Sequence, residues 1–66
     1  MPSVTIEMFE GRTADQKRAV AKGVTEAITR ELGVKPEIVK IRFVDLKKHD
    51  IAWGGELVSD RSTKSG

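Results

Sequence analysis

The chain has 66 residues, 38% of them hydrophobic and only three of them aromatic, so it can form one domain with a small core but not two. The absence of cysteine excludes disulfides and thiolate zinc sites, and the single histidine, His49, cannot form a metal centre by itself. Self-association is therefore the expected source of added stability. The net charge is +2 with the two signs interleaved, so we expect no nucleic-acid partner and also no metal. No stretch approaches the roughly 20 apolar residues of a membrane span, so we expect no association with a membrane and a cytoplasmic location.

Residues 3–9 alternate polar and apolar side chains. Val4, Ile6 and Met8 fall on one face and polar residues fall on the other, which is the pattern of a strand with one buried face. Gly11 breaks the alternation soon afterwards. We therefore predict a first strand over residues 3–9.

A helix of about 19 residues is predicted after this strand. Its start is marked by a capping box, in which the Thr13 hydroxyl accepts from the amide of Gln16 and the Gln16 side chain reaches back. Gly33 stands where a left-handed residue ends a helix. Apolar residues recur at spacings of three and four, which predicts a stripe that faces the sheet. The stripe consists of Val20, Val24, Ala27, Ile28 and Leu32.

A second strand is predicted over residues 38–46, which are rich in β-branched and aromatic side chains. Two strands linked by a helix form a parallel pair with a right-handed crossover. The three elements make one β-α-β unit. Because this unit leaves exposed sheet edges, it favours pairing with another chain.

The remainder of the chain predicts a short hairpin and a tail. Residues 47–50 are expected to form a loop, Gly54-Gly55 a turn, and residues 56–58 a short third strand at an edge. The tail over residues 59–66 is polar, and we expect it to be mobile. The predicted fold class is α+β: a single domain over residues 1–66 with one β-α-β unit and a short C-terminal hairpin.

Three short motifs follow one another along the chain. They are the opening Met1-Pro2, then Glu10-Gly11-Arg12-Thr13 with Asp15-Gln16-Lys17 after it, and finally Gly54-Gly55-Glu56-Leu57. Together they resemble the 4-oxalocrotonate tautomerase family over residues 2–58. The resemblance implies β-α-β subunits that assemble as hexamers or related oligomers, act on a small unsaturated carboxylic acid, and use neither a cofactor nor a metal.

The resemblance also implies that Pro2 is the general base. Once the initiator methionine is removed, its nitrogen is a secondary amine, and an apolar site with nearby cations lowers the pKa of such an amine. The residues expected to form this environment are the apolar Phe9, Ile51 and Trp53 and the cations Arg12, Lys40 and Arg42. Considered alone, Pro2 would instead be interpreted as the first residue of an edge strand, where its missing N–H costs nothing.

Each cation has a different candidate role. Arg12 matches the family position that binds the substrate carboxylate, which suits the bidentate fork of a guanidinium. The family carries a second arginine where this chain has Lys40, and Arg42 lies two residues further along the same strand face. Either Lys40 or Arg42 is expected to polarise the 2-oxo or 2-hydroxy end of the substrate.

Trp53 has two interpretations. The aromatic residue that precedes the glycine turn in the family aligns with Ile51, and Trp53 comes two residues later. A shifted hairpin would return the indole to the pocket. Otherwise Trp53 belongs to an interface or to the core.

Pro2 and Arg12 fall at opposite ends of the first predicted strand. Seven or eight extended residues span about 25 Å, so one chain cannot bring both side chains to one small substrate. If the two act together, Arg12 must come from another subunit. The oligomer is then required for catalysis as well as for stability.

The function implied by the resemblance is a cofactor-independent tautomerase, an isomerase that shifts a proton in a 2-hydroxy-dienoate or an enol-pyruvate type acid. A hydratase or dehalogenase of the same superfamily is an alternative, in which Asp50 would activate water. The adjacent His49 and Asp50 are interpreted as parts of a solvated loop rather than as a catalytic pair. A third hypothesis is an oligomeric scaffold that has kept the fold without the activity.

Overall fold

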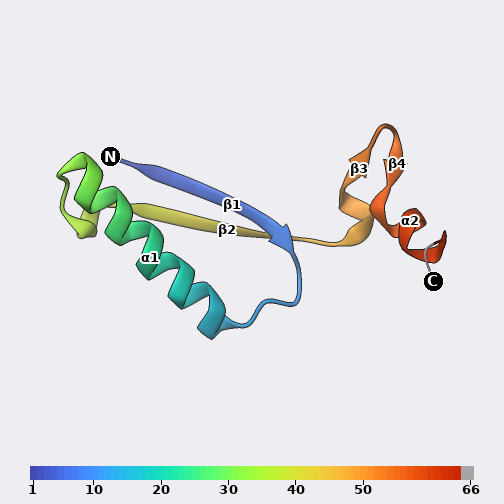
Figure 1. Ribbon diagram of the computed structural model, residues 1–66, viewed down its shortest axis with the longest axis horizontal. Coiled ribbons are helices and arrows are strands. Elements are labelled where there is room, and N and C mark those ends of the chain that lie inside the picture. The colour runs from blue at the N-terminus through green and yellow to red at the C-terminus, as the bar shows by residue number, and fades with distance from the viewer. Residues whose placement is uncertain (65–66) are drawn as a thin grey trace.

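The protein forms a β-α-β unit followed by a small C-terminal hairpin and a helix (Figure 1). The structure, a computed structural model, describes residues 1–64 and the side chains of residues 1–61. β1 (Ser3–Phe9) and β2 (Lys40–Leu46) form a parallel two-stranded sheet, and α1 (Ala14–Leu32) lies in the connection between them. The predicted α+β fold and its parallel strand pair are confirmed.

Both ends of α1 are the ones that the sequence predicts. The Thr13 hydroxyl accepts a hydrogen bond from the backbone N–H of Gln16 at 3.1 Å, and the Gln16 side chain accepts one from the N–H of Thr13 at 2.9 Å. At the other end Gly33 is left-handed, with φ of 69°, and its N–H donates to the Thr29 carbonyl at 3.0 Å. None of the helices within residues 1–64 combines the length and the apolar content that crossing a membrane requires.

The apolar stripe of α1 is only partly covered. Val24, Ala27 and Ile28 are half-buried, whereas Val20 and Leu32 are exposed, Leu32 by 63%. The centre of the stripe is thus covered as predicted, whereas the side chains at its two ends remain accessible in a single chain.

The second strand begins two residues later than predicted. Lys40 is its first residue, and Pro36–Ile38 form the short helix η1 instead of the start of a strand. The N–H of Val39 donates to the Pro36 carbonyl at 3.1 Å, which closes this turn. Proline sets the backbone angle that a first helical turn needs, and this local preference prevails over the β-branched pattern.

A hairpin follows β2, as predicted. The expected loop contains η2 (Lys48–Asp50), a single helical turn, and β3 (Ala52–Trp53) pairs antiparallel with β4 (Glu56–Leu57). Gly54-Gly55 form the turn with φ of 60° and 83°, which glycine adopts without strain.

The segment after the hairpin is helical. α2 (Val58–Lys64) occupies most of the predicted polar tail, so Val58 begins a helix and does not belong to the third strand. The N–H of Val58 donates to the Ile51 carbonyl at 2.9 Å, which ties the start of α2 to the beginning of the hairpin. Residues 65–66 of the predicted tail lie outside the described residues, and the mobility of the tail stays a prediction.

The parallel register gives the sheet two chemically different faces. Ser3 is paired with Lys40, and paired residues of neighbouring strands share a face. One face is turned to α1, because Lys17 of that helix forms an ion pair with Asp45 of β2. The half-buried apolar residues of this face are Val4, Ile6, Met8, Ile41 and Phe43. The opposite face carries exposed polar side chains, among them Lys40 and Arg42.

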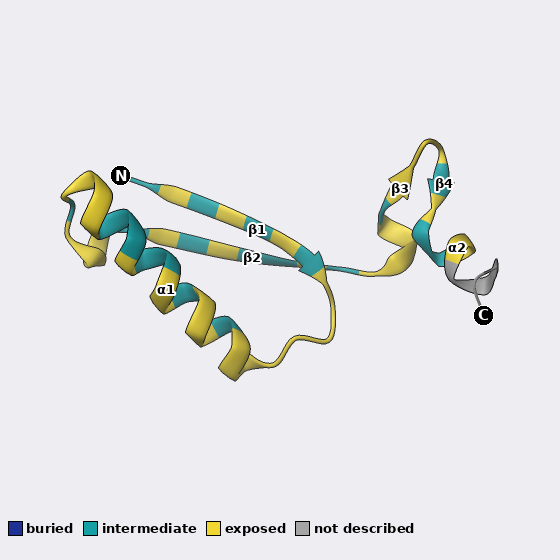
Figure 2. Ribbon diagram, in the orientation of Figure 1, coloured by how far each residue is buried: buried dark blue, intermediate teal, exposed yellow. Residues whose placement is uncertain are grey.

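No side chain among residues 1–61 is fully buried, and Figure 2 shows half-buried and exposed positions alternating along the strands. The accessible surface is 5143 Å², against about 4,200 Å² for a compact monomer of this mass. The radius of gyration is 15.7 Å, against about 11 Å for a compact domain of this length. A single chain therefore leaves large apolar side chains on its surface. They are Met1, Phe9, Val20, Leu32, Ile38, Trp53 and Leu57.

Candidate active site

Pro2 lies immediately before β1 and beside the start of β2. The N–H of Lys40 donates to the Pro2 carbonyl at 3.0 Å. Proline has no N–H of its own, so its place at the end of the ladder leaves no donor unpaired. Pro2 is half-buried, and Met1 before it is exposed. The Pro2 nitrogen is an amide while Met1 is attached and becomes a secondary amine when Met1 is removed.

Lys40 and Arg42 stand on the same face of β2, as predicted. Their partners in the register are Ser3 and Thr5, so both cations lie beside the beginning of β1. Two residues advance about 7 Å along a strand, which is within the reach of long side chains. The structure therefore brings Pro2 and both cations to the same end of the sheet.

Arg12 lies at the other end of the sheet. It stands in the loop after β1, one residue before the N-cap Thr13, and Gly11 ahead of it has a φ of 112° that favours glycine. The seven residues of β1 separate Pro2 from this loop by about 23 Å. As predicted, a single chain does not bring Pro2 and Arg12 to one small molecule.

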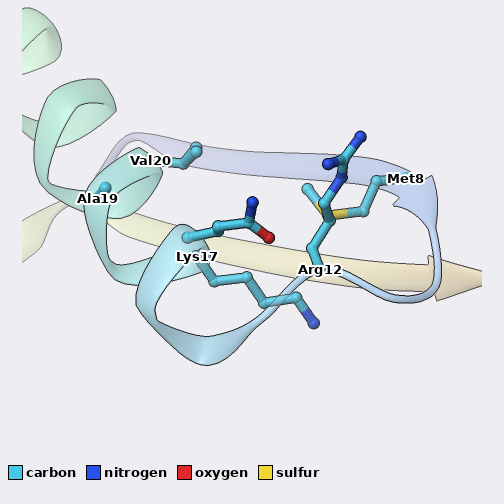
Figure 3. Close-up of a pocket in the computed structure, with 6 residues that line it drawn as sticks. Met8, Arg12, Lys17, Ala19 and Val20 are labelled. Carbon is cyan, nitrogen blue, oxygen red and sulfur yellow. The ribbon is translucent and has the colours of Figure 1, made fainter.

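Arg12 belongs to a pocket between the end of β1 and the first turns of α1 (Figure 3). Its volume is about 370 Å³. The lining residues are Met8, Arg12, Gln16, Lys17, Ala19 and Val20. Figure 3 shows the Arg12 side chain beside that of Met8, while the Lys17 side chain extends in a different direction. The pocket thus combines an apolar wall with the guanidinium of Arg12.

Lys17 is held by β2 rather than directed at Arg12. Its Nζ lies 2.9 Å from Asp45 Oδ2 and 5.9 Å from the centre of the Phe43 ring. The Lys17 side chain is 25% exposed and that of Asp45 44%, so water reaches the pair only in part. Sequence reasoning did not single out Lys17 as a site residue, although it falls within the second of the motifs that carry the family resemblance.

The three apolar candidates do not surround Pro2 within one chain. Phe9 is the last residue of β1, at the same end of the sheet as the Arg12 loop. Trp53 belongs to the C-terminal hairpin and Ile51 directly precedes it, and the hairpin lies at the far end of the molecule from the N-terminus (Figure 1). Trp53 is 62% exposed. These side chains can approach Pro2 only from another copy of the chain.

Asp50 is engaged within its own loop. Its Oδ2 accepts a hydrogen bond from the N–H of Lys47 at 2.9 Å, and its Oδ1 lies 3.9 Å from Nε2 of His49. All three residues are exposed, which favours the interpretation of His49 and Asp50 as a solvated loop. Among the described residues, no three His, Cys, Asp or Glu side chains are grouped so that they could hold a metal ion.

Comparison with known proteins shows the family. The family model described as "Tautomerase enzyme" matches residues 2–61. A probable tautomerase of Bacillus cereus is 39% identical over 61 residues, which cover 92% of this chain and 100% of that protein. The 2-hydroxymuconate tautomerase of Bacillus subtilis is 38% identical over 60 residues, which cover 91% of this chain and 97% of that protein.

Solved structures share the fold. The crystal structure of YwhB, a homologue of 4-oxalocrotonate tautomerase, superposes with a TM-score of 0.83 at 37% identity and covers 89% of this chain and 97% of its own. A structure of the 4-oxalocrotonate tautomerase isozymes from Methylibium petroleiphilum gives a TM-score of 0.88 at 32% identity, with coverage of 96% and 98%.

The β-α-β fold and these likenesses define an isomerase that acts on small-molecule substrates. More narrowly, the chain belongs to the tautomerase family and is a tautomerase of the 4-oxalocrotonate tautomerase type. The family resemblance that its three motifs predict is confirmed.

Proposed function

We propose that the protein is a cofactor-independent tautomerase of 2-hydroxy-dienoate or enol-pyruvate type acids, with Pro2 as the general base. The observation that carries the proposal is the position of Pro2 at the end of the sheet where Lys40 and Arg42 also lie. The name of the Bacillus subtilis relative agrees with an unsaturated 2-hydroxy acid as substrate. The proposal requires removal of Met1, because only a free proline nitrogen is a base.

The proposed reaction is a proton transfer from oxygen to carbon. The Pro2 nitrogen accepts the proton of the 2-hydroxyl group, the enol electrons shift along the conjugated chain, and the same nitrogen returns the proton to the 3- or 5-carbon. Lys40 and Arg42 disfavour the ammonium form of Pro2 and so lower the pKa of its amine. Their charges also stabilise the negative oxygen of the dienolate. The proton is conserved, so no co-reactant is needed.

The complete site is proposed to form between copies of the chain, in a homo-oligomer for which the family resemblance favours a hexamer. Arg12 of a second copy would bind the substrate carboxylate near Pro2, through its bidentate fork. Phe9, Ile51 and Trp53 would supply an apolar wall from neighbouring copies. Two observations support this assembly. Apolar side chains are exposed on the surface, and none of the described side chains is fully buried in a single chain.

The hydratase or dehalogenase alternative requires Asp50 to hold a water molecule for attack. The Asp50 carboxylate instead accepts the N–H of Lys47 and caps η2. This hydrogen bond favours a structural role for Asp50. The tautomerase is therefore the function that the site supports best.

Intact mass and one variant test the proposal. We expect the mass of the purified protein to show that Met1 is removed. We also expect the protein to convert 2-hydroxymuconate and the enol of phenylpyruvate to their keto forms, which is measured by ultraviolet absorbance. Pro2→Ala should lower kcat/KM at least about 100-fold, the usual contribution of a general base. Ser3→Ala changes the next residue and is the matched control. Active protein that retains Met1 would disprove the mechanism, and so would equal rates for Pro2→Ala and the parent. An intact oligomer that turns over neither acid would favour the scaffold hypothesis.

A further inference from the structure

We propose that Lys17 keeps Arg12 available for the substrate carboxylate by holding the Asp45 carboxylate in an ion pair. The proposal rests on the role proposed above for Arg12. It gives Lys17 a positioning role through the charges of the pocket and not a contact with the substrate.

Asp45 is the carboxylate of β2 that lies beside the Arg12 pocket. In the register Asp45 is paired with Met8, which lines the pocket together with Arg12. Both Asp45 and Met8 belong to the sheet face that is turned to α1. A free carboxylate in this position attracts the Arg12 guanidinium and repels a carboxylate ligand. Without a partner, Asp45 would therefore compete with the substrate for Arg12.

The ion pair removes this competitor. Among the described side chains, Arg12 has no carboxylate partner, whereas Asp45 is bonded to Lys17 at 2.9 Å. The Lys17 ammonium also lies near the face of the Phe43 ring, which adds a cation–π attraction and keeps it turned away from Arg12. The pocket as built therefore holds one unpaired positive charge, and the loss of Lys17 would reduce its net charge to zero.

The loop geometry leaves Arg12 able to respond to such a charge. Glu10 donates its N–H to the Leu46 carbonyl at 2.9 Å, and Gly11 with its left-handed φ follows at once. Thr13 is then fixed by the capping box of α1. Arg12 is the exposed residue between these two fixed points. A carboxylate close to the pocket would thus act on the Arg12 side chain without disturbing the strand or the helix.

A second ion pair in the same helical turn provides a control. Arg18 pairs with Asp15, but the two side chains are 73% and 91% exposed and neither lines the pocket. Arg18→Met removes the same unit of charge as Lys17→Met from the neighbouring position. Any effect of overall charge or of the first turn of α1 should therefore appear in both variants.

Steady-state kinetics test the proposal, with KM as the main readout. We expect Lys17→Met to raise KM about twofold to fivefold at unchanged kcat, which is the size of an interaction between partly exposed charges. Asp45→Asn should not raise KM, because it removes the competitor itself. The double variant Lys17→Met/Asp45→Asn should return KM to near the parent value. Lys17→Arg, which keeps the pair, and Arg18→Met should leave KM unchanged.

A purely structural ion pair predicts another pattern. Lys17→Met and Asp45→Asn would then impair the enzyme alike, and the double variant would not restore KM. That pattern, or an unchanged KM in Lys17→Met, overturns the proposal. Raising the ionic strength to about 1 M shortens the Debye length to about 3 Å and should remove the effect of Lys17→Met. Should Lys17→Met fail to assemble by native mass, Lys17→Gln takes its place.

Arg12→Ala separates this proposal from the proposed function. It should raise KM more than any variant of the ion pair, since it removes the carboxylate ligand itself. If Arg12→Ala raises KM and Lys17→Met does not, the positioning role of Lys17 is disproved and the role of Arg12 stands. If Arg12→Ala leaves KM unchanged, both are disproved.

Discussion

Lys40 is joined to Pro2 through the backbone, because its N–H donates to the Pro2 carbonyl at 3.0 Å. This bond lies next to the register pair of Ser3 with Lys40, so the separation of the two backbones is fixed by the sheet. The ladder that positions the proposed base therefore also positions the backbone of Lys40. Changes to the Lys40 side chain should therefore act on the chemistry without displacing Pro2.

We expect Lys40→Ala to shift the pH dependence of the reaction. Loss of a cation near the Pro2 amine raises the pKa of that amine, since its ammonium form is then less disfavoured. A general base acts when unprotonated, so the acid limb of kcat/KM against pH should move to higher pH and the rate at neutral pH should fall. The pH–rate profile is the measurement, and Lys22→Ala on the exposed side of α1 is the control. An acid limb at the same pH as in the parent would contradict this role.

Two impaired variants should recover activity when their subunits are mixed. Pro2→Ala replaces the secondary amine of the proposed base by a primary amine and Arg12→Ala lacks the carboxylate ligand, but a site that takes each residue from a different copy is complete in a mixed oligomer. After refolding of an equal mixture, about a quarter of the sites should be intact if subunits assort at random. The rate of the mixture is compared with that of each variant refolded alone. Isotope labelling and native mass identify the mixed oligomers. If these form but the rate does not rise above that of the separate variants, the two residues do not share a site across copies.

Trp53 should report assembly, because it is the single tryptophan and is 62% exposed in one chain. If the hairpin packs against another copy, the indole emission should move to longer wavelength as the protein is diluted and the oligomer dissociates. Native mass at the same concentrations is the parallel measurement. Phe9→Asp places a charge on the exposed apolar surface and should shift dissociation to higher protein concentration. Emission that stays constant while the oligomer dissociates would place Trp53 outside the interface.

Asp50→Ala should cost stability but little activity. The change removes the hydrogen bond from the N–H of Lys47, which is worth about 1 kcal/mol in the free energy of unfolding. Urea unfolding at a fixed chain concentration measures that loss. Tautomerase rates should stay near those of the parent. Halide release from a haloacrylate is measured for both proteins. If the parent releases halide and Asp50→Ala does not, the dehalogenase alternative is favoured.

The parts of the fold that depend on local chemistry could be predicted from the sequence. The capping box of Thr13 and Gln16 and the left-handed Gly33 determine the ends of α1 through neighbouring backbone groups. The start of β2 was misplaced because β-branched residues suit a strand, while Pro36 favours a helical turn. α2 was not predicted, because its polar residues carry no apolar periodicity that would reveal a helix.

The candidate site was predictable where it follows from distance along a strand. Pro2 and Arg12 were expected at opposite ends of β1, and the structure places them there. The ion pair of Lys17 with Asp45 joins residues that are 28 positions apart, and it depends on how α1 lies across the sheet. No spacing rule reveals such a contact, so it became visible only in three dimensions.

Every pair of the β1–β2 ladder joins residues 37 positions apart, from Ser3 with Lys40 to Phe9 with Leu46. The chain must close a loop of this length before it gains its first ladder bond, and the entropy of closure is lost before any such bond compensates it. α1 forms from local contacts and shortens the loop by holding 19 residues in a helix. Because one chain fully buries none of its described side chains, we expect the helix to form first and the strands to pair as copies meet, so that the refolding rate rises with protein concentration.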